Sequence, residues 1–371
     1  MNLLGFKKIL LLILGLSLMF TCESKDRNNR PLVWDMEALM EMKANVANNT
    51  AAKEIIRRAD HYCKTEPIII TSGRNAFVSD SHYYFSMAPY RWPDPEGSGQ
   101  YIWKDGEVNP ESREYGSAKL SELCNRCLYL SKAFFLTEEK KYYNAFVAQL
   151  QAWFINKETY MYPSFEYAQV IPGVDNNKGN PAGQIESYNF NTIIESIRLV
   201  NGVKRINKRI IKGLKAWFID FIEESEKRCG SLYKKSNSNI ALSYDVTLIN
   251  MYLFVGKESK AKDLADTFAE RRINVQILED GSQPDELKRT NAFSYSLVNL
   301  THMVDGCVLI MYWDKDYYSK HCERIDRAFE YLQQYIDEPE IFPYKQIAGW
   351  DGVSKDFEKL KQRKELLRIK R

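Results

Sequence analysis

The fold class is decided by residues 120–134, LSELCNRCLYLSKAF. Apolar side chains recur along this stretch at alternating steps of three and four residues, at Leu120, Leu123, Cys127, Leu130 and Phe134. Because an α-helix turns once every ~3.6 residues, this spacing places all five side chains on one face. The stretch therefore predicts an amphipathic helix that buries one apolar stripe against its neighbours.

The same periodicity recurs in three later segments. Their apolar stripes are Phe146, Leu150 and Trp153; Ile210, Leu214, Trp217 and Phe221; and Ile325, Phe329, Leu332 and Ile336. Strand-like alternation is scarce, and residues 68–71 form either a short strand or an extended connector. Successive amphipathic helices joined by modest loops predict an all-α fold. We expect a single-domain (α/α) toroid, an incomplete barrel of antiparallel helical hairpins; a plain α-solenoid satisfies the same periodicities.

Length, composition and charge limit the class of protein. The chain has 371 residues, of which 44% are hydrophobic and 27% charged, as in ordinary globular proteins. Its net charge of +3 gives no basic field that would favour nucleic acid as a partner. We place the toroid at residues 34–350 and a charged C-terminal tail at residues 351–371.

The N-terminus has the features of an export signal. Lys7 and Lys8 precede an apolar run that is too short to span a bilayer, and Cys22 follows that run. We expect a signal peptide over residues 1–22 with a lipobox whose Cys22 is lipidated, and a tether over residues 23–33. An ordinary cleaved signal is the alternative. In either case the protein is exported, either periplasmic or anchored in the outer membrane, and touches a membrane only through the N-terminal lipid.

Cysteine spacing gives no metal site. Cys124 and Cys127 form a CxxC pair inside the helical pattern, where Cys127 falls on the apolar face. No second CxxC or histidine pair completes a zinc site, so we expect core thiols. We predict no metal and no organic cofactor.

Residues 82–95, HYYFSMAPYRWPDP, combine aromatic side chains, a histidine and three prolines. Proline fixes φ and removes a backbone donor, so this segment is neither a helix interior nor a central strand. A rigid aromatic loop on a helical scaffold is typical of a sugar-binding cleft, because apolar sugar faces stack on aromatic rings. A packed loop that caps the helical domain is the alternative.

Further segments extend this pattern. They read YIWKDGEVNPE at residues 101–111, YAQVIPGV at 167–174, and DGSQPDELKR at 280–289 followed by FSY at 293–295. In order and wording, these segments and APYRWPDP resemble the alginate lyase family of helical polysaccharide lyases, from about residue 80 to residue 300. The resemblance implies an (α/α) toroid that cleaves uronate polymers by β-elimination.

The resemblance also implies roles for individual residues. Arg289 and Tyr295 stand at the positions of the family's arginine and tyrosine, and Asn239 matches its asparagine. In the family the arginine and asparagine neutralise the uronate carboxylate, and the tyrosine is the acid and sometimes also the base. A tyrosine that acts as base needs a lowered pKa, and we expect Arg289 to be the cation that lowers the pKa of Tyr295.

One position departs from the family pattern. The family carries an Asn-His pair before a helix, but residues 236–245 read SNSNIALSYD and place Ile240 where the histidine belongs. Isoleucine transfers no protons. His82, in the aromatic loop, is the candidate substitute. If Tyr295 serves as both base and acid, the proton and the leaving group must lie on the same face of the sugar, as in mannuronate-type linkages.

The remaining histidines are not expected to act in catalysis. His302 falls on an apolar helix face and is predicted to be structural, whereas His61 and His321 are predicted to lie at the surface. For the cleft walls we expect Tyr90 and Trp92 to stack on sugars, or else to pack within loops.

Gln169 completes the candidate cleft, as a hydrogen-bond donor to a hydroxyl or a carboxylate or as a loop-packing residue. The partner is then an acidic polysaccharide or oligosaccharide such as alginate, and we expect a monomer. One alternative function is a degenerate, non-catalytic protein that binds uronate oligosaccharides, since Ile240 replaces the histidine. A second is a glycoside hydrolase using a pair of acids among Asp94, Glu166 and Glu286.

Overall fold

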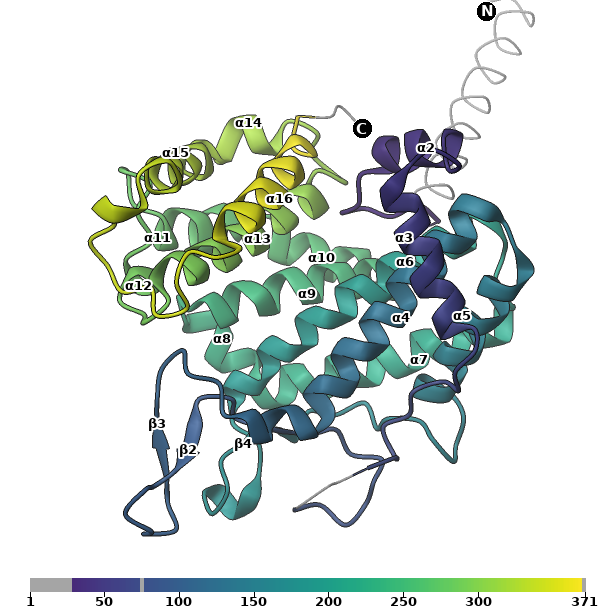
Figure 1. Cartoon of the computed structure of the whole chain (residues 1–371), viewed down its shortest axis with the longest axis horizontal. Coiled ribbons are helices and arrows are strands. Elements are labelled where there is room, and N and C mark those ends of the chain that lie inside the picture. Colours follow the sequence, from purple (N-terminus) through teal and green to yellow (C-terminus); the bar gives the residue numbers. More distant parts are fainter. Residues whose placement is uncertain (1–28, 74–76, 369–371) are drawn as a thin grey trace, which may run out of the picture.

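The computed structural model describes residues 29–73 and 77–368, which form a helical assembly with a few short strands (Figure 1). The expected signal peptide, Cys22 and most of the tether lie outside the described residues. The helices are α2 (Met36–Ala44), α3 (Thr50–Tyr62), α4 (Gly116–Thr137), α5 (Lys140–Phe154), α6 (Phe190–Val203), α7 (Lys208–Ser225), α8 (Ser231–Lys235), α9 (Asn239–Val255), α10 (Glu258–Ala265), α11 (Asn274–Gln276), α12 (Pro284–Leu287), α13 (Ala292–Ile310), α14 (Tyr317–His321), α15 (Glu323–Asp337) and α16 (Val353–Glu365).

The long helices pack side by side around one core. Helix α4 packs against α3, α5 and α6, and α9 packs against α6, α7, α10 and α13. The five apolar residues of the 120–134 stripe are all buried. Helix α9 is buried along nearly its whole length, from Ala241 to Phe254, because neighbouring helices cover all its faces. The predicted all-α toroid is confirmed.

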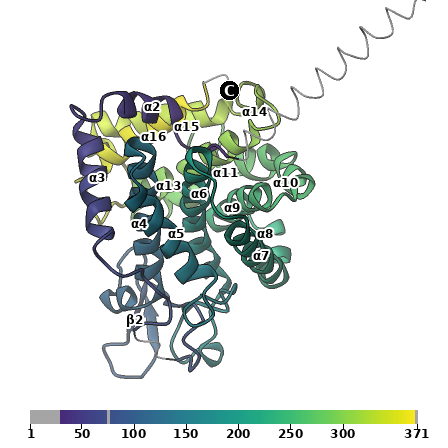
Figure 2. The same ribbon diagram turned by 90° about the vertical axis from the view of Figure 1, so that its right-hand side faces the viewer.

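Two small sheets lie at one end of the helices. Strand β1 (Phe85–Met87) pairs in parallel with β4 (Tyr167–Val170), and β2 (Arg91–Pro93) pairs antiparallel with β3 (Tyr101–Trp103), with Trp92 opposite Ile102. Figures 1 and 2 agree in placing the strands at one end of the molecule and α2, α14 and α16 at the other. The proline-rich aromatic segment therefore forms edge strands and turns, as its composition requires.

Residues 68–71 form a connector rather than a strand: residues 68 and 69 are irregular, and residues 70 and 71 belong to a turn. The side chain of Gln149 from α5 accepts from the backbone N–H of Ile68 at 2.9 Å and donates to its carbonyl at 2.8 Å. This side-chain amide satisfies the backbone groups that a neighbouring strand would otherwise satisfy.

The C-terminal region differs from the expected charged tail. Most of residues 351–371 form α16, which packs against α13 and buries Val353, Phe357 and Leu360. The guanidinium of Arg363 also pairs with the buried carboxylate of Asp305 on α13. The apolar side chains are spaced four and three residues apart, so this segment is an amphipathic helix whose exposed face carries the charges.

The described end of the expected tether also packs onto the core. The backbone N–H groups of Leu32 and Val33 donate to the buried carboxylate of Glu195 on α6, at 2.5 and 2.9 Å. Arg198, one helical turn further on, pairs with the same carboxylate. Among the described residues, no helix is both long and apolar enough to cross a bilayer.

Candidate active site

Asn239 is the first residue of α9, and its position depends on the turn before it. Ser238 caps the helix by accepting a hydrogen bond from the backbone N–H of Ala241. Serine is among the favoured residues at this position because its oxygen satisfies a backbone donor that has no partner within the helix. The Asn239 side chain is half-buried beside the turn.

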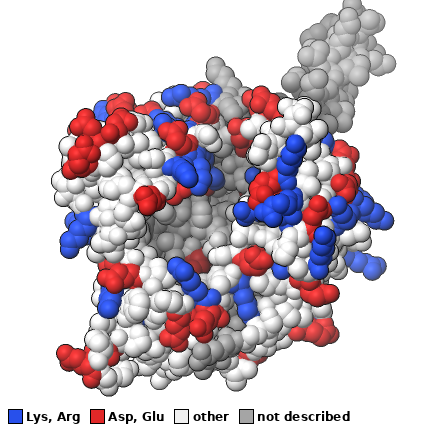
Figure 3. All heavy atoms as spheres, in the orientation of Figure 1, with Lys and Arg blue, Asp and Glu red and all other residues white. Residues whose placement is uncertain are grey.

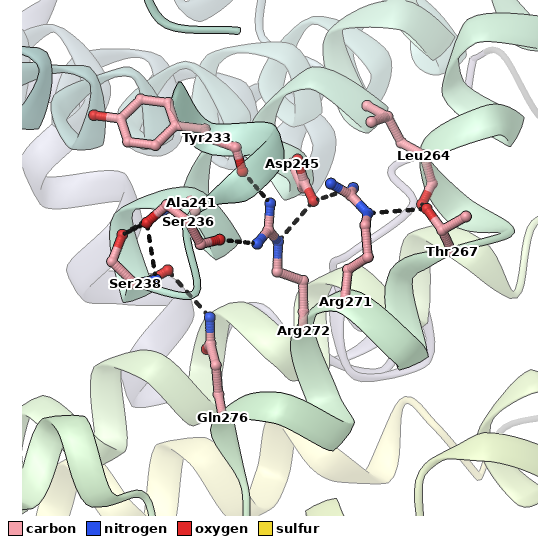
Figure 4. Close-up of polar contacts among 10 residues, drawn as sticks. All are labelled: Tyr233, Ser236, Ser238, Ala241, Asp245, Leu264, Thr267, Arg271, Arg272 and Gln276. Carbon is pink, nitrogen blue, oxygen red and sulfur yellow. Dashed lines mark hydrogen bonds and ion pairs between the residues drawn. The ribbon is translucent and has the colours of Figure 1, made fainter. Parts of the chain in front are cut away.

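A buried arginine fixes this turn (Figure 4). Arg272 donates to the carbonyl of Ser236 at 2.5 Å, to the carbonyl of Tyr233 at 2.8 Å and to the carboxylate of Asp245 at 2.8 Å. Arg271 donates to the same carboxylate at 2.6 Å. Arg272 is 1% exposed and Asp245 is 2% exposed, so the network holds the turn from inside the fold.

Buried amides join this turn to the segment that carries the predicted arginine. Gln276 donates to the carbonyl of Ser238 at 3.1 Å, and Asn299 donates to the side-chain oxygens of both Gln276 and Gln283. Gln283 immediately precedes α12, and Arg289 follows two residues after the end of that helix. The elements that carry Asn239 and Arg289 are therefore held by one hydrogen-bonded network.

Arg289 is paired with Asp105, from the loop after β3. Its Nη2 lies 2.6 Å from Oδ1 and its Nε lies 3.1 Å from the same oxygen. Thr290 donates its backbone N–H and its hydroxyl to Asp105 as well. Burial would raise the pKa of Asp105, but the hydrogen bonds from Arg289 and Thr290 outweigh it and lower the pKa below its usual range. Gly106 permits this approach, since a Cβ there would lie 2.4 Å from the Thr290 hydroxyl and the residue has φ of +75°.

Tyr295, in the first turn of α13, lies directly against this ion pair. The Arg289 guanidinium carbon is 3.8 Å from the centroid of the Tyr295 ring, and the phenol oxygen of Tyr295 lies 2.5 Å from that of Tyr90. Burial and then the Tyr90 hydrogen bond raise the pKa of Tyr295 well above its usual value. Arg289 acts in the expected direction and lowers it, but does not reverse the shift, so the expectation of a lowered pKa is wrong.

Glu286 on α12 is a further acid in this group. The amide of Asn239 donates to its carboxyl oxygen at 3.1 Å, and the residue is only 5% exposed. Burial raises the pKa of Glu286 to about 7, although Arg289 and the Asn239 hydrogen bond both act to lower it. From the sequence, Glu286 is a candidate only as a hydrolase acid, because nothing local in the sequence signals its burial beside Asn239.

Trp92 and Trp103 lie on the β2–β3 hairpin, which leads into Asp105. Trp92 donates its indole N–H to the carbonyl of Glu107 at 2.9 Å, and the ammonium of Lys104 lies 5.0 Å from its ring centroid. Trp103 is 53% exposed, and its ring meets that of Tyr90 edge-on at 5.5 Å. Sequence reasoning missed Trp103, although it stands in the quoted YIWKDGE segment.

His82 belongs to a different group of residues. Its Nδ1 lies 2.6 Å from the backbone carbonyl of Tyr160, and its ring stacks on that of Tyr162 at 5.1 Å. Because a carbonyl only accepts, the ring proton sits on Nδ1. Within the described residues, no hydrogen bond or ring contact of His82 reaches Tyr295, Arg289 or Asn239.

Gln169 lies on β4 and belongs to a third group. Its backbone has φ of +51°, a left-handed conformation that side-chain-bearing residues seldom adopt, and its N–H donates to the Ser86 hydroxyl at 2.8 Å. Glu186 accepts from Tyr84 and Ser86 at 2.6 and 2.7 Å. Burial raises the pKa of Glu186, whereas hydrogen bonds from Tyr84, Ser86 and Gln169 act to lower it. Strained backbone of this kind is typical of functional sites.

Comparisons with known proteins identify the family to which the chain belongs. The sequence matches the family described as alginate lyase over residues 76–342. A crystal structure of an alginate lyase from Bacteroides ovatus superposes with a TM-score of 0.85 at 30% sequence identity, covering 92% of this chain and 96% of that chain. No curated protein sequence matches the chain.

The chain belongs to the alginate lyase family. The family assignment makes it a polysaccharide lyase, and the substrate class that the family implies is an acidic polysaccharide. Figure 3 shows that the face seen in Figure 1 is hollowed near its centre, with basic and acidic side chains around the hollow.

Other residues considered in this lyase fall outside the Asn239–Arg289–Tyr295 group. His302 is buried with its ring 3.9 Å from that of Tyr188, as expected of a structural histidine, and burial lowers its pKa to about 3. His61 and His321 are exposed, as predicted. The described residues contain no group of three or more His, Cys, Asp or Glu side chains that could hold a metal ion.

The three acids considered for hydrolysis have different partners in the described structure. Asp94 accepts from Ser98 at 2.6 Å, Glu166 pairs with Lys178 at 2.9 Å, and Glu286 contacts Asn239. Membership of a lyase family and this separation into different groups both argue against the hydrolase alternative.

Proposed function

We propose that this lyase cleaves a uronate polymer, alginate in particular, by β-elimination, with Tyr295 as acid and base and with Arg289 and Asn239 neutralising the substrate carboxylate. The observation that carries the proposal is the Arg289 guanidinium seated on the Tyr295 ring at 3.8 Å. The contact supports the proposal because elimination needs a cation for the carboxylate and a proton-transferring group close to the same sugar.

The elimination needs three events around one sugar. The proton on C5 is removed, the electron pair of that C–H bond forms the C4=C5 double bond, and the bond from C4 to the glycosidic oxygen breaks. The departing oxygen takes a proton, and no water is consumed. Arg289 and Asn239 would hold the carboxylate whose electron withdrawal makes the C5 proton acidic, and preorganised donors stabilise the charge that develops there.

The protonation state of Tyr295 defines its first role. Because burial and Tyr90 raise its pKa, Tyr295 carries its proton in the free site and is ready to act as the acid. To act as base it must first release that proton to solvent; it then takes the C5 proton and passes it to the departing glycosidic oxygen. Tyr295 donates its hydrogen bond to Tyr90 while it is protonated. Once Tyr295 is ionised, the Tyr90 hydroxyl can turn and donate to the phenolate, and the adjacent Arg289 charge stabilises it further.

A preference for mannuronate-type linkages follows if Tyr295 performs both proton transfers. Ile240 is half-buried, packs against the core and offers no titratable group beside Asn239. The polar contacts of His82 are made elsewhere. With one group serving as base and acid, the C5 proton and the leaving oxygen must lie on the same face of the ring.

An absorbance assay tests the proposal. The purified protein would be incubated with mannuronate-rich alginate, guluronate-rich alginate and glucuronan, and the conjugated double bond created by elimination would be followed. We expect the largest signal with mannuronate-rich alginate and a loss of about 10³-fold in the Tyr295→Phe variant. A signal that Tyr295→Phe leaves unchanged would exclude the proposed acid and base.

A non-catalytic uronate-binding protein is the second candidate, and two observations favour it. Ile240 stands in place of the family histidine, and the pKa of Tyr295 is raised rather than lowered. The discriminating variant is Ile240→His. Absence of elimination in the natural protein, together with retained oligosaccharide binding and a large gain of cleavage in Ile240→His, would establish this alternative.

Export and lipid anchoring through Cys22 are also part of the proposal, as is a monomeric state. Mass spectrometry of the membrane-associated protein should find the chain beginning at a diacylated Cys22. A Cys22→Ala variant should no longer fractionate with membranes. Light scattering of the soluble domain should give the mass of one chain.

A further inference from the structure

The part of the proposed site that would bind the substrate carboxylate carries little uncompensated positive charge. Arg289 already shares its Nε and Nη2 with the Asp105 carboxylate. The main charged groups that act on Glu286 are Arg289, Asp285 and Asp105, which are one cation and two anions. A second carboxylate, brought by the substrate, would enter a site whose cation is already paired.

We propose that Glu286 is a third carboxylate-binding group and that it acts as the neutral acid, donating its O–H to the substrate uronate so that each uronate binds together with one proton. This inference rests on the proposed function and names the group that completes charge neutralisation in the same site. The residue contacts Asn239 at 3.1 Å and lies close enough to Arg289 for their charges to interact, so it adjoins both groups proposed to hold the carboxylate.

Charge balance decides which form of Glu286 can bind a uronate. With Glu286 ionised, the group of Arg289, Asp105 and Glu286 would carry a net negative charge and repel the substrate carboxylate. With Glu286 protonated, the same group is neutral and gains a hydrogen-bond donor. Two carboxyl groups that share a site hold one proton between them, because like charges at short range disfavour double ionisation.

The burial of Glu286 makes the proton available at neutral pH. Its pKa of about 7 in the free site means that a substantial fraction is already protonated there, and an incoming carboxylate will raise the pKa further. Ile240 supplies no donor at the neighbouring position. In the described structure, the titratable side chain within hydrogen-bonding distance of Asn239 is that of Glu286.

Titration calorimetry can measure the number of protons that the protein takes up when it binds the substrate. A mannuronate oligosaccharide would be titrated into the Tyr295→Phe variant, which blocks turnover, at about pH 8 in two buffers of different ionisation enthalpy. We expect uptake of close to one proton per bound chain end or site, and a Kd that rises about tenfold per pH unit above the pKa of Glu286. Adding Glu286→Gln, which mimics the neutral acid, should abolish both the uptake and the pH dependence.

Asp285→Asn is the matched control. Asp285 is the exposed neighbour on the same helix, where it pairs with Lys288. In the Tyr295→Phe background this variant should still take up the proton.

Each contrary result has a distinct meaning. Binding without proton uptake, or uptake that persists after Glu286→Gln, would overturn the inference and leave the lyase proposal standing. A Glu286→Gln enzyme with a normal Tyr295 that binds substrate but loses elimination about 10³-fold would also overturn the inference, and it would contradict the role of Tyr295 as base, because Glu286 would then be the base. Absence of binding to any oligouronate would contradict the proposed function, and with it this inference.

Discussion

The phenol oxygens of Tyr295 and Tyr90 lie 2.5 Å apart, although 205 positions separate the two residues in the sequence. Tyr90 comes from the aromatic loop between β1 and β2, and Tyr295 from the first turn of α13. The contact joins the segment whose aromatic composition suggested a sugar cleft to the residue proposed to transfer protons. The loop therefore affects the protonation of Tyr295 and also forms part of the walls of the site.

Replacing Tyr90 by phenylalanine should lower kcat more than it changes KM. The variant keeps the ring but removes the hydroxyl that is placed to stabilise the Tyr295 phenolate. Because a hydrogen bond to a charged group contributes about 1.5–3 kcal/mol, kcat should fall by roughly 10- to 100-fold. Steady-state kinetics on alginate measure this. An unchanged kcat would show that the hydroxyl contact has no part in proton transfer.

Replacing Arg289 by lysine should not be tolerated. Lysine keeps the charge but loses both the bidentate contact with Asp105 and the stacking on the Tyr295 ring. We expect kcat/KM to fall about 100-fold or more, equivalent to roughly 3 kcal/mol of transition-state stabilisation. Lys288→Met, at the exposed neighbouring cation, is the control and should leave kcat/KM unchanged. Full activity with lysine at position 289 would argue that only its charge matters.

Removing the buried arginine behind Asn239 should destabilise the whole protein. Arg272→Met leaves Asp245 buried with Arg271 as its one remaining side-chain partner among the described residues, and it frees two backbone carbonyls. Breaking a buried pair costs about 3–5 kcal/mol, a large part of a typical unfolding free energy. Arg271→Met, whose side chain is 24% exposed, should cost about 1 kcal/mol. Equal losses for the two variants in urea unfolding would refute the special role of Arg272.

The buried His302 should make the protein sensitive to acid. Burial lowers its pKa to about 3, from an ordinary value of 6.5, so the residue is neutral in the fold and protonates more readily when unfolded. Its contribution to stability is complete above about pH 6.5. It is lost as the pH falls towards 3, by about 1.4 kcal/mol for each pH unit.

A His302→Gln variant provides the comparison for that pH dependence. Its unfolding free energy should decrease less steeply than that of the natural protein between about pH 6.5 and 3. Urea denaturation at several pH values measures both slopes. Parallel slopes would show that His302 is not the group responsible.

The helical scaffold could be predicted from the sequence because the spacing of apolar residues within each helix identifies the face that is buried. The stripe from Leu120 to Phe134 needs only the helical period to be read, and all its members are buried. The same period was present at Val353, Phe357 and Leu360, but the many charges around them concealed it. Composition misleads where a narrow apolar stripe is enough to pack a helix.

The site could be predicted only in part, because its pairings are long-range. The wording of the motifs pointed to Arg289 and Tyr295, whereas the partnership of Arg289 with Asp105 depends on how the β2–β3 hairpin meets α13. The raised pKa of Glu286 likewise arises from burial, which no local pattern encodes. His82 was a plausible base by residue type, but its ring is fixed by the Tyr160 carbonyl.

The most direct test of elimination at Tyr295 is to count double bonds against broken linkages. The natural protein and Tyr295→Phe would be incubated in parallel with mannuronate-rich alginate, measuring conjugated double bonds by absorbance and new reducing ends chemically. We expect one double bond for every new reducing end in the natural protein, and loss of both in Tyr295→Phe. New reducing ends without double bonds, or undiminished double-bond formation in Tyr295→Phe, would contradict it.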